Sequence, residues 1–458
     1  MNQLRSPLSL SEADRRVWLL IGVITALGVL FIPFSQVVLE VDYDYTLRTV
    51  ALGGAILGVV SGVLGCFAVL RQESLMGDAL SHAALPGVAI AFLIAGRDLS
   101  VLLIGAGIAS WVGVQFIQSV LRTTRIKQDT AMGIVLAAWF AAGIALLAYI
   151  QGLPDASQAG LDMFIFGQAA AIVESDVQLI TTVGLVAFVI VGLFWKEFKL
   201  ITFDPEFAGA NGFRVGLIGG LLSTLIVVAI VLGLQLAGVI LMVGMLIAPG
   251  IAARQWTHKL DQMVILAGVL GAFAGGTGAI LSAVDADVPP GPMIIVVAFA
   301  GVALAIAFAP GRGLVWTLRR RRRDRRRFAA QTVLRDAYRY AQSHGDTYYP
   351  IPETFLVGIR GTTGELGLSQ LEKHGAVTRY GAGWVLTAEG ARLAAADARN
   401  QQLWEIYREY SDALDLPLIA EDRQKAIHDL LPPMAVAKLE QQLTHLHRMD
   451  RIETQGVV

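Results

Sequence analysis

The sequence has a single cysteine, Cys66, and charged residues make up only 16% of its 458 residues. One cysteine excludes a disulfide framework and any metal site built from several cysteines. Soluble domains carry about 25% charged residues, so the shortage of charge argues against an ordinary soluble protein. Uncharged apolar runs recur across the first two thirds of the chain, which excludes intrinsic disorder and secretion into the medium.

The shortage of charge is confined to the first part of the chain. Residues 1–311 hold 14 Lys and Arg and 19 Asp and Glu, whereas residues 312–458 hold 22 and 18. The first part is too apolar for one soluble domain, and the second has the composition of a small soluble domain. We therefore predict four divisions, which are an N-terminal segment at 1–16, a transmembrane domain at 17–312, an Arg-rich linker at 313–329 and a C-terminal domain at 330–458.

Ten apolar segments account for the first part, and most approach the roughly 20 residues that a membrane-spanning helix needs. Residues 79–96 and 236–253 are short enough to be re-entrant or broken. We therefore expect an all-α polytopic membrane protein with eight to ten spans. No cleavage site of small residues follows the polar N-terminus, which argues against a signal peptide. The segments are residues 17–39, 50–70, 79–96, 99–121, 131–151, 177–195, 213–233, 236–253, 263–284 and 291–310.

Positive charge indicates the orientation of these segments. If the N-terminus is cytoplasmic and all ten segments cross, 12 of the 14 Lys and Arg lie in inner loops, and only Arg48 and Arg97 lie outside. This bias predicts an inner-membrane protein with both termini in the cytoplasm. The outer loops carry carboxylates instead. Among them, Asp285 and Asp287 are candidates for an outer entrance for a cation, although they also fit ordinary solvated loops.

The most informative stretch is residues 71–87, which places Asp78 and His82 four residues apart. A helix presents both side chains on one face, and ionisable groups within membrane segments usually face a pathway or a partner. Carboxylate and imidazole suit Mn(II), Fe(II) or Zn(II). One chain supplies only two such ligands, and a twofold dimer would supply four. By spacing alone, an Asp–His pair four residues apart is more often a local hydrogen bond than a metal site.

The stretch RQESLMGDALSHAALPGVAIAF (71–92) resembles the hallmark segment of permeases of the metal-ion ABC import family, which takes up zinc, manganese or iron. Further segments resemble the same family in the same order, and together they cover about residues 15–312. They are RIKQDTAMGIV (125–135), LDMFIFGQ (161–168), FKLITFDPEFAGANG (198–212), LQLAGVILMVGMLIAPGIAAR (234–254) and SAVDADVPPGPMIIV (282–296).

The resemblance implies a fold similar to that of the vitamin-B12-type importers and a dimer with a second copy or a paralogue. It also implies a cytoplasmic dimer of ABC ATPases and an extracytoplasmic metal-binding protein. The chain would hold no permanent cofactor and would carry Mn, Zn or Fe as its cargo, and the sequence does not distinguish the three metals. This sequence has no GxxxxGK[ST] phosphate loop, so we expect the chain itself not to be an enzyme.

Carried over to this sequence, the resemblance makes Asp78 and His82 the metal-pathway residues and residues 203–212 the helix that couples to the ATPase. Asp followed by Pro is typical of a helix start, and Gly of a helix end. We therefore predict a helix of about seven residues here. The coupling residues are Phe203, Asp204, Pro205, Glu206, Phe207 and Gly212.

The C-terminal domain begins with the run LRRRRRDRRR (318–327), which suits anionic lipid headgroups beside a membrane span. Such a run also fits nucleic-acid binding. An amphipathic helix is expected from Phe328 to about His344. Residues 364–394 resemble a winged helix, with a helix ending at Gly375, a wing turning at 381–383 and a helix from Thr387. We expect separate helices at 403–416 and within 421–447.

This order resembles the iron-dependent, diphtheria-toxin-type repressor family over about residues 330–447. Gln401 stands where that family has a His ligand, and Ile427 replaces a Glu, so Glu405 and His428 are candidate remnants of a regulatory metal site. Past residue 327 the net charge is −4, which repels DNA phosphates. We therefore expect a regulatory or assembly domain that binds no nucleic acid.

Two other functions fit parts of the sequence. One is a membrane-tethered, metal-responsive transcriptional regulator, and the other is a proton-coupled secondary carrier that works without an ATPase. Copurification with a separate ATP-binding subunit would distinguish the importer from both.

Overall fold

The computed structural model describes residues 12–73, 75–96, 98–152, 172–285, 288–310, 312–420 and 426–455. The chain divides into two compact units, Met1–Trp316 and Thr317–Val458, called here the membrane unit and the C-terminal unit. Each unit is described by itself.

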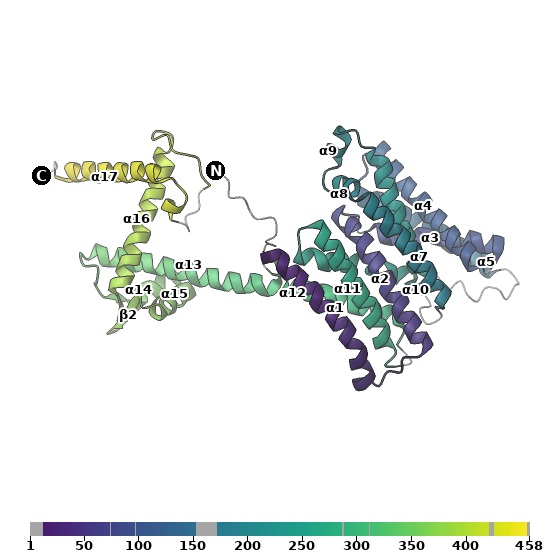
Figure 1. The fold of residues 1–458 in the computed structure, drawn as a ribbon. Coiled ribbons are helices and arrows are strands. Elements are labelled where there is room, and N and C mark those ends of the chain that lie inside the picture. Colours follow the sequence, from purple (N-terminus) through teal and green to yellow (C-terminus); the bar gives the residue numbers. More distant parts are fainter. Residues whose placement is uncertain are drawn as a thin grey trace. The chain divides into compact units, whose positions relative to one another are not determined.

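Helices make up the membrane unit (Figure 1). Nine of the described helices are long and apolar enough to cross a membrane, within the eight to ten spans predicted. The short helix α8 was not predicted. The elements are α1 (Glu12–Val38), α2 (Tyr45–Leu70), α3 (Met76–Ala95), α4 (Leu99–Thr123), α5 (Gln128–Gln151), α7 (Glu174–Leu193), α8 (Trp195–Phe203), α9 (Pro205–Ala210), α10 (Val215–Trp256), α11 (Leu260–Ser282) and α12 (Pro290–Phe308).

Helix α10 contains both apolar segments that we predicted at 213–233 and 236–253, and they form two arms of one bent element. Gly238 lies between them with φ 72° and ψ 174°. A positive φ of this kind is readily adopted by glycine and strained for other residues. The helical hydrogen-bond pattern therefore breaks at this residue.

The arms of α10 fold back on each other. A Cβ atom on Gly233 would overlap the Met242 side chain, although nine residues of straight helix span about 13 Å. Lys199 precedes α10 in the sequence and Asp261 follows it. The Lys199 Nζ atom nevertheless lies only 3.5 Å from the Asp261 carboxylate. Both ends of α10 therefore lie at the same end of the bundle.

Helix α2 packs closely against α11. A Cβ atom on Gly58 would overlap the Gly271 carbonyl, and the same holds between Gly54 and Gly275 on the next turn. Small residues let two backbones approach closely, which is how helices associate in lipid. The glycine-rich runs at 53–65 and 271–280 thus form the close contact between α2 and α11.

The C-terminal unit combines helices with a small antiparallel sheet of strand order β1-β3-β2. The strands pair Ile351 with Trp384 and Val377 with Leu386. Its first core joins α13, α15 and the sheet, and its second joins α16 and α17. The elements are α13 (Leu314–Ser343), β1 (Ile351–Pro352), α14 (Glu353–Arg360), α15 (Thr362–Lys373), β2 (Val377–Tyr380), β3 (Gly383–Leu386), α16 (Ala388–Tyr410), the 3-10 helix η3 (Ile427–Asp429) and α17 (Pro433–Gln455).

Local turn residues in this unit lie where the sequence placed them. Gly375 follows α15 with φ 69°, Gly381 turns between β2 and β3 with φ 59°, and the Thr387 hydroxyl accepts a hydrogen bond from Gly390 N–H at the start of α16. The expectation of a separate helix at 403–416 was wrong. Helix α16 runs unbroken to Tyr410 because no Gly or Pro interrupts it after Gly390.

The α2–α11 contact generates a matched test. Gly271→Ala should lower the stability of the membrane unit by about 1–3 kcal/mol, because the new methyl group overlaps a backbone carbonyl. Gly301→Ala on α12 is the control, since its Cβ meets nothing within 4 Å. Thermal unfolding of the full chain in detergent measures both. Equal midpoints for the two variants would contradict the role of the glycine contact.

Candidate metal pathway and coupling helix

Asp78 and His82 lie on one face of α3, as their spacing predicted. The His82 Nε2 atom lies 3.5 Å from Asp78 Oδ1. This distance is at the limit of a hydrogen bond, so the two side chains hold each other only weakly. The Asp78 side chain is 39% exposed and that of His82 is 22% exposed. Within the single chain, both groups are therefore accessible.

The imidazole of His82 is positioned by an aromatic contact. The ring of Phe140 on α5 meets it edge-on, with 4.8 Å between the ring centroids. An edge-to-face contact of this kind contributes about 0.5–1.5 kcal/mol and restricts the ring. Helix α5 therefore orients the imidazole.

One chain does not hold a complete metal site at this place. Among the residues that the structure describes, no group of three or more His, Cys, Asp and Glu lies close enough to bind a metal ion. Asp78 and His82 therefore supply two ligands, whereas structural and catalytic zinc sites use three or four protein ligands. The arrangement agrees with a shared site, and the dimer axis stays a prediction.

The predicted outer entrance is only partly described. Asp285 lies between α11 and α12, where its carbonyl accepts a hydrogen bond from Val288 N–H. Asp287 and the motif at 161–168 lie outside the described residues. Asp285 follows the last residue of α11, Ser282, and thus lies at the opposite end of that helix from Asp261.

The predicted coupling helix is α9. The Asp204 carboxylate accepts a hydrogen bond of 2.9 Å from Phe207 N–H, and Pro205 occupies the first turn. The helix ends before Gly212, which has φ 83°. Cap, proline and glycine thus act as predicted, and the helix has six residues rather than about seven.

One side of α9 is anchored and the other is open. Ala208 is fully buried, and its carbonyl accepts a hydrogen bond from Phe213 N–H. By contrast, Phe207 on α9 is 56% exposed, and Phe203, the last residue of α8, is 53% exposed. Exposed aromatic side chains on a rigid helix are typical of a protein interaction surface.

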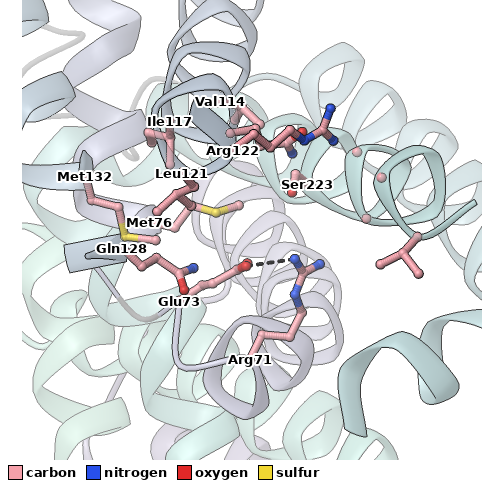
Figure 2. A pocket seen from close by; sticks show the side chains of 15 residues that line it. Arg71, Glu73, Met76, Val114, Ile117, Leu121, Arg122, Gln128, Met132 and Ser223 are labelled. Carbon is pink, nitrogen blue, oxygen red and sulfur yellow. Dashed lines mark ion pairs between the residues drawn. The ribbon is translucent and has the colours of Figure 1, made fainter. Parts of the chain in front are cut away.

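A polar cavity, called here the inner pocket, lies beside the start of α3 (Figure 2). Its volume is about 520 Å3, and it is lined by the ends of α2 and α4 and the first turns of α5 and α10. Arg71 and Glu73 form an ion pair of 2.8 Å in its wall. From residues 71–87, only Asp78 and His82 were predicted as functional, and this ion pair was missed. No signal in neighbouring residues shows that helices distant in the sequence enclose it.

Burial changes the chemistry of Glu73. The residue is only 6% exposed, and burial raises the pKa of its carboxyl, while Arg71 and Gln128 oppose part of that rise. Loss of water disfavours the charged form of a carboxyl group. The Oε2 atom has no hydrogen-bond partner in the part of the chain that the structure describes.

The two candidate remnants in the C-terminal unit lie on different elements, α16 and η3. Glu405 is exposed on α16, and His428 Nε2 lies 3.9 Å from Glu440, which also accepts from Arg399 at 3.2 Å. Within the described ranges, no ion pair joins Glu405 to His428. A structural ion-pair cluster describes this corner better than a metal site does.

Comparison with known proteins matches the membrane unit to one family. The ABC 3 transport family matches residues 42–309. The zinc transport system membrane protein TroC of Treponema pallidum is 47% identical over 282 residues, which are 61% of this chain and 94% of that protein. The manganese transport system membrane protein MntC of Bacillus subtilis is 38% identical over 401 residues, which are 87% of this chain and 92% of that protein.

The MntC alignment reaches beyond the membrane unit. Its 401 residues exceed the 316 of that unit, so it includes part of the C-terminal unit. Among solved structures, PsaBC from Streptococcus pneumoniae in complex with Fab matches with a TM-score of 0.53 and 31% identity. That match covers 62% of this chain and 97% of the other.

Proposed function

The chain belongs to the ABC 3 transport family, and from this premise we propose that it is the permease subunit of an ATP-driven importer of a divalent transition-metal ion. The observation that carries the proposal is the family match over 42–309, which contains both α3 with Asp78 and His82 and the coupling helix α9. Relatives named for zinc and manganese support these two metals as cargo, and the ligand types also suit iron.

Asp78 and His82 are the metal-pathway residues of this proposal. Both are accessible within the single chain and lie on an otherwise apolar helix, where an ionisable group is costly without a function or a partner. A second copy, or a paralogue, would bring two further ligands to the ion. Asp285 and Asp287 would then attract the cation on the outer side, where an extracytoplasmic metal-binding protein delivers it.

Helix α9 is the contact to the ATPase in this proposal. Its exposed Phe207 and Glu206 would lie in a groove of the cytoplasmic ATPase dimer, while buried Ala208 transmits the movement to the bundle. The ATPase is a separate polypeptide, because this sequence has no phosphate loop.

We place α9 and both termini in the cytoplasm. Basic residues cluster at the bundle end that carries α9: Lys199 pairs with Asp261, and Lys259 pairs with Asp14 at 2.6 Å. Positive residues favour the cytoplasmic side of a membrane. The same orientation puts residues 318–327 beside the anionic inner leaflet, where eight Arg side chains would bind lipid headgroups.

The C-terminal unit is a regulatory or assembly module in this proposal. Helix α15 followed by the β2–β3 hairpin supports a winged-helix fold similar to that of the iron-dependent repressors. The net charge of −4 past residue 327 removes the electrostatic attraction on which duplex binding depends. We therefore propose that the C-terminal unit contacts the partner permease or the ATPase and does not bind nucleic acid.

The pathway assignment predicts the outcome of two substitutions. Asp78→Asn and His82→Ala should each lower uptake of radioactive manganese and zinc by at least about tenfold, because each removes a ligand worth about 1.5–3 kcal/mol. Asp129→Asn and His258→Ala are matched controls at exposed sites. Membrane insertion and complex assembly should be unchanged in all four. Wild-type uptake by the Asp78–His82 double variant would exclude the pathway.

The coupling assignment predicts that replacing both Glu206 and Phe207 with Ala separates ATP hydrolysis from transport. The complex should either fail to assemble or hydrolyse ATP without uptake, whereas Glu197→Ala on α8 should do neither. Crosslinking from an introduced cysteine checks the contact directly. The native Cys66 is buried and therefore does not compete in the reaction. Phe207→Cys should crosslink to the ATPase and lipid-facing Leu185→Cys should not. If Phe207→Cys does not crosslink to the ATPase, a segment other than α9 couples ATP hydrolysis to transport.

The charge argument predicts that a fragment of residues 328–458 folds, dimerises through α16 or α17, and does not shift duplex DNA even at low salt. The fragment keeps the buried Ala329 and omits the Arg run. Deleting the unit should alter transport rate or complex stability and leave metal selectivity unchanged. Binding of the fragment to the promoter of its own operon would favour a tethered regulator instead.

A further inference from the structure

The inner pocket has a surplus of positive charge. Arg71 and Glu73 neutralise each other through their ion pair. Arg122, at the end of α4, also lines the cavity, and its guanidinium has no hydrogen bond or ion pair with any residue that the structure describes. One full positive charge is therefore left without a counter-charge. A divalent cation would be repelled here.

The pocket contains hydrogen-bonding groups that the protein leaves unused. In the described part of the chain, Arg71 Nη1 and Glu73 Oε2 are buried without partners. The hydroxyl of Ser223 and the amide of Gln128 line the same cavity. Buried polar atoms normally find partners, so an unmet set around one cavity indicates an absent ligand.

Helix α10 presents a glycine face to the two guanidinium groups. A Cβ atom on Gly216 would lie 2.6 Å from Arg122 Nη2, and one on Gly219 would lie 3.8 Å from Arg71 Nη2. Because these glycines have no side chains, the guanidinium groups of Arg122 and Arg71 lie against the first turns of α10. Arg214, at the N-cap, makes no side-chain hydrogen bond to this turn. The uncapped N-terminus of a helix adds partial positive charge.

We propose that the inner pocket binds a phosphate group, either that of an anionic phospholipid headgroup or free phosphate. Guanidinium groups match the oxygen geometry of phosphate, and their hydrogen bonds to it are charge-assisted. Arg122 and Arg71 Nη1 would donate to the oxygens, together with Ser223 and Gln128. Glu73 stays in its ion pair with Arg71 and orients that guanidinium group.

The ligand would join three separate helices. Arg71 ends α2, Arg122 lies in the last turn of α4, and Ser223 belongs to the first arm of α10. Basic pockets between membrane helices are known sites for anionic headgroups. The site is distinct from the transported ion and does not depend on which metal is carried.

The test uses the full chain in dodecyl maltoside, a detergent without phosphate. In one arm, sodium phosphate is titrated against sodium chloride at constant ionic strength, and the thermal unfolding midpoint is followed. In the other, phosphatidylglycerol is added, and both the midpoint and the lipid adducts in native mass spectrometry are measured. A ligand that binds only the folded state raises the midpoint as it saturates.

We expect saturable stabilisation in at least one arm, and the arm that responds identifies the source of the phosphate. Arg122→Gln should weaken that binding about tenfold or more, and Ser223→Ala should weaken it less. The control is Arg125→Gln, an exposed arginine three residues away that does not line the cavity. The proposal is overturned if neither phosphate source stabilises the wild-type chain, or if Arg125→Gln loses as much binding as Arg122→Gln.

Discussion

The side chains of the membrane unit are about as apolar as lipid, so burying them against each other yields no hydrophobic gain inside a bilayer. Dispersion contacts at short range must hold the helices instead, and these require backbones that approach closely. The packing of α2 against α11 meets this requirement, because glycines on both helices face each other's carbonyl groups. Once α2 is held there, Arg71 at its end and the loop to α3 are placed as well. The position of Asp78, in the first turn of α3, thus depends on glycines that contact no ligand.

Local sequence signals predicted those parts of the structure that local chemistry decides. Asp204 and Pro205 start α9 because a cap and a fixed φ act within a few residues, and long apolar runs become helices because lipid leaves no other partner for the backbone. The bend at Gly238 could not be predicted from local sequence signals. The chain has 48 glycines, and only the packed structure shows which of them takes a positive φ. The inner pocket requires four helices from distant parts of the sequence, so no window of residues contains its signal.

Asp78 and His82 illustrate how a correct pattern can support two explanations. Their spacing alone favours a local pair, whereas the family resemblance favours a metal site. A separation of 3.5 Å makes the local pair weak, and His82 is oriented by Phe140 rather than by its carboxylate neighbour. A pair formed only for packing would gain from full burial and a short hydrogen bond, whereas these side chains are partly exposed and 3.5 Å apart. Two accessible donors on one helix face suit an ion that binds briefly, because a complete four-ligand cage in one chain would release its cargo slowly.

Helix α9, the inner pocket and the helix that carries Asp78 and His82 follow one another in space. A Cβ atom on Gly209 of α9 would lie 3.9 Å from Val215, Val215 lines the inner pocket together with Met76, and Met76 begins the helix that carries Asp78. Contiguity transmits force only if some element has two arrangements. In the loop between α2 and α3, Gln72 adopts φ 60°, a left-handed conformation that costs a non-glycine residue about 1–2 kcal/mol.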